Sequence, residues 1–382
     1  MMAERVPIDT YCEKKIPTLQ KTYDGLIDYV DISSVDNTEK KIISYQTIES
    51  NDAPSRAKQL LKKGDVLVST VRPNLNAVAV VEEETENLMV GSTGYCVLRC
   101  KDNMDVRYLF NFCQSQYFVD DMSSQATGAS YPAVSNGIVR SALIPCYSIE
   151  EQREIAEKMD TVSELLALCK QQLAELDELI KSRFIELFGD PETNPKGLEK
   201  VLLSDIAEYF NGLTYSPDNV TNDGTIVLRS SNIQNSQLDF ADTVRVNSSI
   251  KDKLFVKDND ILMCSRNGSA RLVGKVALIK NLSEPMTFGA FMMIIRSRYY
   301  PYLMTYFQMD AFRRQIATGA TTTINQITGN MLNKISLPLP NMADINEFAT
   351  FVEQTDKSKL AVQQSIAELE ELKKSLMQKY FG

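Results

Sequence analysis

One segment of this chain occurs twice. Residues 144–189 align with residues 337–382 without a gap, at an offset of 193. In both copies a short apolar segment ending in proline leads into about forty residues of helical pattern that close on Phe-Gly. The match continues upstream more weakly, where Gly64-Asp65 faces Asn259-Asp260 and residues 126–129 face residues 317–320. The sequence therefore predicts a tandem duplication of a globular module followed by a long helix.

The two predicted helices are called the arms, and each carries an apolar seam. In the first arm the apolar residues recur at alternating steps of four and three, the heptad pattern of a helix that packs on another helix. The first seam consists of Ile155, Met159, Val162, Leu166, Cys169, Leu173, Leu176 and Ile180. The second consists of Phe348, Val352, Thr355, Val362, Ile366, Leu369, Leu372 and Leu376, and it is weaker around residues 356–359. Each arm would be about 55 Å long. Because the duplication supplies a partner helix in the same chain, we expect an antiparallel coiled coil with an internal pseudo-twofold axis, in preference to a parallel homodimer.

The modules upstream of the arms are strand-rich. Short β-branched and aromatic runs such as residues 66–71 and 225–228 predict strands, and residues 105–125 and 299–317 predict helical stretches. The expected fold class is α+β, with two mixed modules and two long helices. The expected boundaries are 1–148 for the first module, 149–189 for the central helix, 190–340 for the second module and 341–382 for the C-terminal helix.

Composition excludes several classes of function. The chain contains no histidine, which removes Ser-His and Cys-His catalysis, and we expect neither catalytic residues nor a metal site. Seven cysteines without regular spacing indicate a reduced, cytoplasmic protein. The sequence contains no run of eighteen apolar residues, so it predicts no membrane-spanning helix. The net charge of −9 is concentrated on the arms, which carry −7 of it, so the modules themselves are compatible with binding DNA.

Two diverged modules, each followed by a closely matched long helix, resemble the specificity subunit of type I restriction-modification systems over the full chain. Particular segments carry the resemblance. They are the aspartate-aliphatic strands at 64–67 and 259–262, the Ala-Thr-Gly loops at 126–128 and 317–319, and the proline-to-helix transitions that follow. The first arm opens with residues 150–155, which are similar to the family's usual sequence, whereas residues 343–346 of the second arm depart from it and lack the glutamine.

The resemblance implies a protein that catalyses nothing itself. Each module would be a target recognition domain that reads one half of a split site in double-stranded DNA. The paired arms would set the spacing and dock two modification (methyltransferase) subunits, which carry S-adenosylmethionine, so that this chain would bind no cofactor. Restriction subunits would join that core.

Candidate DNA contacts lie in two pairs of loops at matching places in the modules. Arginine, lysine, asparagine and glutamine read base edges, and small hydroxyl side chains beside glycine suit a close approach to phosphate. In the first module the candidates are Arg72, Asn74, Asn76, Ser130 and Tyr131, and in the second they are Arg266, Asn267, Arg271, Thr321 and Thr322. Ordinary polar turns remain the alternative for each loop.

Two other functions remain open. A coiled-coil adaptor that joins protein partners without meeting DNA would need the arms but not the loops. A stand-alone enzyme would need a cofactor or base-holding motif, and we find neither an Asn/Asp-Pro-Pro-aromatic loop nor a strand–Gly-x-Gly–helix unit.

Overall fold

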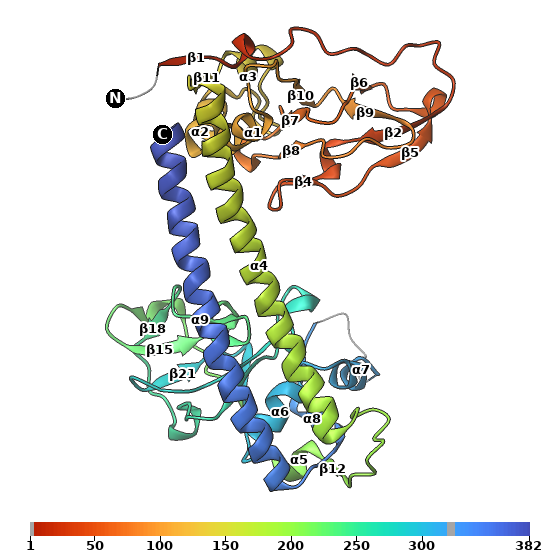
Figure 1. Ribbon diagram of the computed structural model, residues 1–382. Helices are drawn as coiled ribbons and strands as arrows, with labels where there is room; N and C mark the ends of the chain where they lie inside the picture. The colour runs from red at the N-terminus through yellow and green to blue at the C-terminus, as the bar shows by residue number, and fades with distance from the viewer. Residues whose placement is uncertain (1–3, 319–324) are drawn as a thin grey trace. The chain divides into compact units, whose positions relative to one another are not determined.

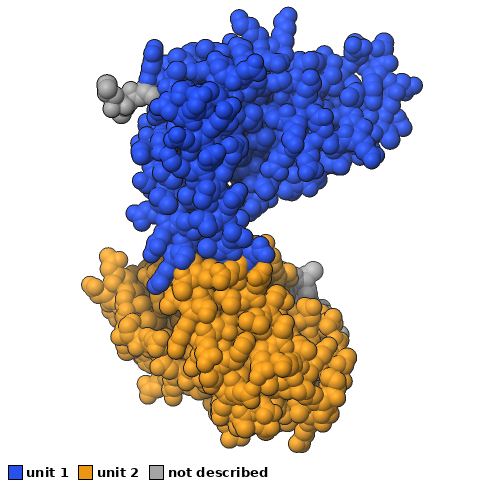
Figure 2. Space-filling view, viewed as in Figure 1, with its two compact units in different colours: residues 1–171, 363–382 blue, residues 172–362 orange. Residues whose placement is uncertain are grey.

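The computed structural model describes residues 4–318 and 325–382. The chain divides into two compact units, unit 1 with residues 1–171 and 363–382 and unit 2 with residues 172–362 (Figure 2). Each unit consists of one strand-rich module and a part of each arm. The arms are α4 (Ile149–Phe188) and α9 (Met342–Phe381), labelled in Figure 1. The α+β fold class expected from the sequence is confirmed.

Module 1 is built from small sheets and short helices. A four-stranded sheet has the order β5-β2-β9-β6, formed by Gln46–Glu49, Leu26–Val30, Leu88–Ser92 and Ala57–Leu60. A three-stranded sheet has the order β10-β7-β8, formed by Tyr95–Leu98, Val66–Ser69 and Val78–Val80. A hairpin joins β3 (Val35–Asp36) to β4 (Lys41–Ile42). The helices are α1 (Val106–Gln114), α2 (Gln116–Gln125) and α3 (Asn136–Ser141).

Module 2 also contains two main sheets, a hairpin and short helices, but both of its main sheets have four strands. The sheet β13-β22-β19-β20 consists of Glu208–Asn211, Met292–Arg296, Ile261–Cys264 and Val276–Leu278. The sheet β14-β18-β15-β21 consists of Val220–Thr221, Val244–Val246, Thr225–Leu228 and Met286–Phe288. The hairpin β16-β17 joins Ile233–Gln234 to Gln237–Leu238. The helices are α5 (Leu203–Ile206), α6 (Tyr300–Tyr306), α7 (Asp310–Thr318) and α8 (Gly329–Leu332).

Each module closes on itself directly before its arm. In module 1 the first strand, β1 (Arg5–Pro7), pairs antiparallel with the last, β11 (Leu143–Pro145). In module 2 β12 (Lys200–Leu202) pairs in the same way with β23 (Ser336–Pro338). The long-range pairing explains why the duplicated segment starts with an apolar strand ending in proline: the strand closes the module, and proline ends it.

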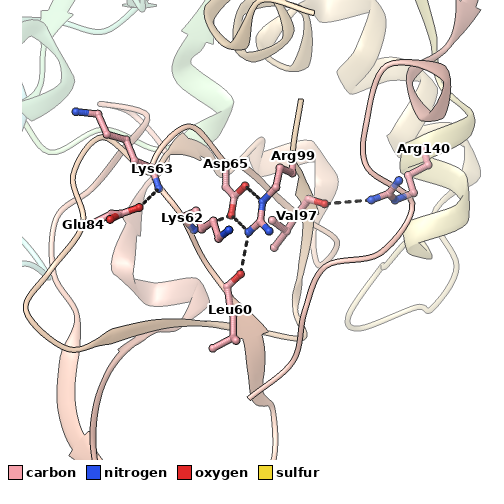
Figure 3. Close-up of polar contacts among 8 residues, drawn as sticks. All are labelled: Leu60, Lys62, Lys63, Asp65, Glu84, Val97, Arg99 and Arg140. Atoms are coloured by element: carbon pink, nitrogen blue, oxygen red, sulfur yellow. Dashed lines mark hydrogen bonds and ion pairs between the residues drawn. The ribbon is translucent and has the colours of Figure 1, made fainter. Parts of the chain in front are cut away.

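A buried ion pair explains the aspartate that both modules share. Arg99 donates from Nε and Nη2 to the two carboxylate oxygens of Asp65, at 2.7 Å each (Figure 3). Arg296 binds Asp260 in the same bidentate way, at 2.7 and 2.6 Å. Both aspartates are 1% exposed, and hydrogen bonding to them raises the pKa of each arginine. The preceding residues, Gly64 and Asn259, have φ values of 88° and 70°, a left-handed turn that favours glycine and asparagine.

The start of the first arm follows from its local sequence. Ser148 Oγ accepts a hydrogen bond from the Glu151 amide at 3.2 Å, while the Glu151 carboxylate accepts from the Ser148 amide at 2.8 Å. This reciprocal capping box satisfies amides that an open helix end would leave unpaired. The arm ends at Gly189, whose φ of 78° suits the left-handed residue that stops many helices.

The arms pair antiparallel within each unit. In unit 1 the start of α4 and the end of α9 share one core, and in unit 2 the end of α4 and the start of α9 share another. With one exception the predicted seam residues are buried or half-buried: Ile155, Met159, Val162, Leu166, Cys169, Leu173, Leu176, Ile180, Phe348, Val352, Thr355, Val362, Ile366, Leu369 and Leu376. Leu372 is an exception, because it is 46% exposed and the adjacent Lys373 is the half-buried residue. No helix among the described residues is both long enough and apolar enough to cross a lipid bilayer.

Candidate nucleic-acid interface

The first candidate loop of module 1 leaves the buried strand β7 and turns sharply. A short 3-10 helix, Pro73–Leu75, is flanked by Arg72 and Asn76, both with left-handed φ values of 50° and 47°. The side chains of Arg72 and Asn74 are exposed. Asn76 is half-buried and donates from Nδ2 to the carbonyl of Gln114 at 3.4 Å, so part of its amide serves the module's own structure.

The structure brings the two candidate loops of module 1 together. The Arg72 amide donates to the carbonyl of Pro132 at 2.7 Å, and the Val134 amide donates to that of Thr70 at 2.9 Å. This pairing places the guanidinium carbon of Arg72 4.6 Å from the ring centroid of Tyr131, which is 68% exposed. Cation–π contact on an exposed ring holds an arginine without neutralising it. Residues 72 and 131, which are distant in sequence, therefore present one exposed surface.

Glycine is required within this surface. Gly128 has a φ of 106°, and a Cβ atom there would lie 2.8 Å from the carbonyl oxygen of Tyr131. The Thr127 and Ala133 backbones exchange hydrogen bonds at 3.0 and 2.9 Å around it. The tight turn exposes Ser130 at its tip.

Module 2 has the same backbone pairing, but the aromatic ring beside its arginine comes from a different segment. The Ile327 amide donates to the carbonyl of Ser265 at 2.7 Å, and the Asn267 amide donates to that of Asn325 at 3.4 Å. The guanidinium carbon of Arg266 lies 5.3 Å from the ring centroid of Phe291, which is 59% exposed. Arg271 is exposed in a 3-10 turn, Ala270–Leu272. The candidates Thr321 and Thr322 lie outside the described residues.

The backbone pairing shows which residues correspond. Thr70 and Ser265 accept the equivalent hydrogen bond, so Arg72 corresponds to Asn267 and Arg266 corresponds to Val71. The two arginines that the sequence places in matching loops therefore stand one residue apart on the common frame. Asn267 is also partly used locally, because its Oδ1 accepts from the Ser269 amide at 3.0 Å and its Nδ2 donates to Ser230 Oγ at 3.4 Å.

One residue of the candidate surface, Phe291, was not identified from the sequence. Phe291 precedes β22 and reads as part of that strand's apolar run, whereas in the structure it is exposed and lies against Arg266. An aromatic residue directly after a Gly-Ala pair, at 289–290, was the available signal. In the part of the chain that the structure describes, no cluster of three or more Cys, Asp or Glu side chains could hold a metal ion.

The duplicated module, the exposed arginine-bearing loop in each copy and the paired arms define a class of protein that carries two related modules on one chain. The family model described as "Type I restriction modification DNA specificity domain" matches residues 8–178 and again residues 195–371. The chain belongs to this family and carries two copies of its domain. Specificity subunits are the non-catalytic component of type I restriction-modification systems.

Similar proteins agree with this assignment. The chain is 24% identical over 312 residues to the EcoKI specificity subunit of Escherichia coli strain K12, covering 75% of this chain and 67% of that protein. It is 24% identical over 319 residues to the StySPI specificity subunit of Salmonella potsdam, covering 74% and 66%. The chain thus spans about two thirds of the length of these relatives. A solved chain from a study of type I restriction-modification complex assembly matches its fold with a TM-score of 0.62 at 24% identity, over 100% of this chain and 97% of that one.

Proposed function

We propose that each module reads one half of a split, asymmetric site in double-stranded DNA. One observation carries the proposal: in both modules the loop after β7 or β19 is hydrogen-bonded to the segment before the last short helix, and each loop holds an exposed arginine beside an exposed aromatic ring. Module 1 presents Arg72 over Tyr131, and module 2 presents Arg266 over Phe291 with Asn267 beside it. Because arginine and asparagine distinguish bases by their hydrogen-bonding edges, unequal loops on equal frames should read unequal half-sequences.

The arms supply the remaining parts of the proposed role. Each is 40 residues long, or about 60 Å, and their antiparallel pairing makes them suited to fixing the gap between half-sites. Leucines off the seam stay exposed, such as Leu168 at 60% and Leu360 at 54%. Exposed apolar side chains on a helix are suited to docking a protein, and we assign this surface to two modification subunits. Restriction subunits would join the resulting complex in the cytoplasm.

The chemistry would reside on those partners. We assign S-adenosylmethionine to the modification subunits and no cofactor to this chain. In this scheme the chain determines which DNA sequence is methylated, and the modification subunits catalyse the methylation. The seven cysteines are free thiols in the structure, as a reducing compartment would keep them.

Sequencing of methylated adenines in the host genome tests the proposal. The expected result is a split motif with a fixed gap, modified on both strands, that disappears when the gene for this chain is deleted. Replacing residues 190–340 by the second module of a relative should change one half of the motif and leave the other half and the gap intact. A motif that survives deletion, or that changes in both halves after the replacement, would contradict the proposal.

A further inference from the structure

A pocket in unit 1 lies beside the first candidate loop and has a volume of about 350 Å³. Its walls come from the turn before β4, the loop after β7, the end of α1 and the last turns of α9. The lining residues are Lys40, Asn76, Gln114, Glu370, Lys373, Lys374 and Met377. Three lysines against one glutamate give the pocket a positive charge.

Lys373 stands where the duplication places an apolar residue. At the offset of 193 its counterpart is Ile180, which is 9% exposed in the core of unit 2. Burial and the nearby charge of Lys170 lower the pKa of Lys373, and Asp160 offsets this in part. Among the described residues no carboxylate forms an ion pair with Lys373. A half-buried cation on the seam is therefore left without a carboxylate partner from this part of the chain.

A second half-buried lysine on the same arm, Lys359, forms ion pairs with carboxylates. Lys359 corresponds to the seam residue Leu166, and its ammonium lies 2.5 Å from the carboxylate of Asp177 and 3.8 Å from that of Asp356. This seam accepts a lysine when carboxylates neutralise it. The contrast indicates that Lys373 is available to an acidic group from outside the part of the chain that the structure describes.

Lys40 reaches the same pocket from module 1. It ends a turn in which Asp36 Oδ1 accepts from the amides of Thr38 and Glu39, and its φ of 56° is unusual for a lysine. Its ammonium donates to the carbonyl of Asn76. Burial and the charge of Lys373 lower the pKa of Lys40. Two half-buried ammonium groups thus repel one another across a pocket that an anion would stabilise.

We propose that the pocket of Lys40, Lys373 and Lys374 binds a phosphodiester group of the DNA backbone. The inference rests on the proposed function, because Asn76 belongs both to the pocket and to the loop that carries Arg72. A backbone phosphate has only acceptor oxygens and one negative charge, which matches ammonium donors. The contact carries no sequence information, and it would hold the duplex in register while Arg72 meets the bases.

Module 2 differs at the corresponding positions. Ile180 stands in place of Lys373, and Lys181, the counterpart of Lys374, pairs with Glu178 at 2.6 Å. Ser236 precedes β17 as Lys40 precedes β4, and its hydroxyl bonds Gln308 at 3.3 Å. The proposed phosphate contact is therefore specific to module 1 and would make DNA binding electrostatically unequal between the two modules.

The test compares the full chain with the double variant K40Q/K373M and with the control K41Q/K379Q, which removes two exposed lysines close to the same turn and on the same arm. Affinity for a duplex carrying the methylation motif, and for a scrambled duplex, is measured across a salt series. The double variant should weaken binding to both duplexes by the same factor and reduce the log–log salt slope by about 1, while the control keeps the slope. Circular dichroism melting checks that every variant folds.

A duplex with single neutral methylphosphonates locates the contact. The unmodified chain should lose affinity at one backbone position near the module 1 half-site, and K40Q/K373M should be insensitive there. If K40Q/K373M binds the motif with an unchanged salt slope and an unchanged methylphosphonate profile, this inference is overturned while the proposed function stands. Loss of modification-subunit binding with unchanged DNA affinity would also overturn it, because the occupant would then be an acidic protein segment. No DNA binding by the unmodified chain would overturn both this inference and the proposed function.

Discussion

The ring centroids of Phe381 and Tyr108 lie 5.2 Å apart, so the last turn of α9 is part of the hydrophobic core of module 1. Phe188, at the end of α4, meets Tyr302 of module 2 at the same distance of 5.2 Å. Tyr108 and Tyr302 in turn donate to the carbonyls of Pro145 and Pro338, the last residues of the strands that close each module. Each arm therefore begins at one module and ends inside the core of the other.

Removing the Phe381 ring should destabilise unit 1. The side chain is fully buried, and the change F381A should lower the free energy of unfolding by about 3–5 kcal/mol, the usual cost of truncating a buried phenylalanine. Urea denaturation measures the effect. L372A on the same helix should cost far less, because Leu372 is 46% exposed. Equal losses for the two variants would show that the arm end does not form part of the core.

Breaking the buried ion pair of module 1 should be costly, and the second replacement should restore part of the loss. D65A leaves the Arg99 guanidinium without its carboxylate, and we expect a loss of about 3–5 kcal/mol in urea denaturation. D65A/R99M removes the uncompensated charge and should be more stable than D65A. D102A, at an exposed aspartate nearby in sequence, is the control and should change stability little. A double variant less stable than D65A would contradict this account.

Removing the loop arginines should reduce DNA affinity without affecting the fold. R72A and R266A should each cost about 1–3 kcal/mol in binding to the motif and should relax the preference for one half-site only. Fluorescence anisotropy with motif duplexes altered in either half measures both effects. The exposed arm residue Arg153 provides the control, R153A. Unchanged affinity in R72A/R266A would favour a coiled-coil adaptor over a DNA reader.

Neutralising Lys373 should stabilise the chain while weakening its binding to DNA. Its pKa is lowered in the folded state, so the folded protein disfavours the charged form. The penalty is fully present below the folded pKa, where lysine is charged in both states, and it disappears as the pH rises past the unfolded value. K373M should therefore raise the free energy of unfolding at neutral pH by a few tenths of a kcal/mol, the scale of like-charge repulsion on a helix. Urea denaturation from neutral to alkaline pH should show this gain shrinking; a gain that grows with pH would contradict the assignment.

Much of this architecture could be predicted from local pattern. The heptad spacing placed the arms, and the seam residues from Ile155 to Ile180 are buried or half-buried as expected. The prediction was wrong at Leu372. This leucine fits the heptad spacing and is apolar, but it is exposed, and the adjacent Lys373 is the half-buried residue on the seam. The loop residues were found by their type and matching position, but the exact correspondence of Arg72 with Asn267 required the backbone hydrogen bonds.

Local sequence pattern was enough to predict the duplication, the family and the location of the unequal loops, because repeats, heptads and turn residues involve neighbouring positions along the chain. Tertiary structure alone decided that Phe381 completes the core of module 1, that Arg72 lies over Tyr131, and that Lys40 and Lys373 share one pocket. These contacts join residues far apart in sequence. No local period or propensity encodes them, since they depend on long-range strand pairing and on the antiparallel register of the arms.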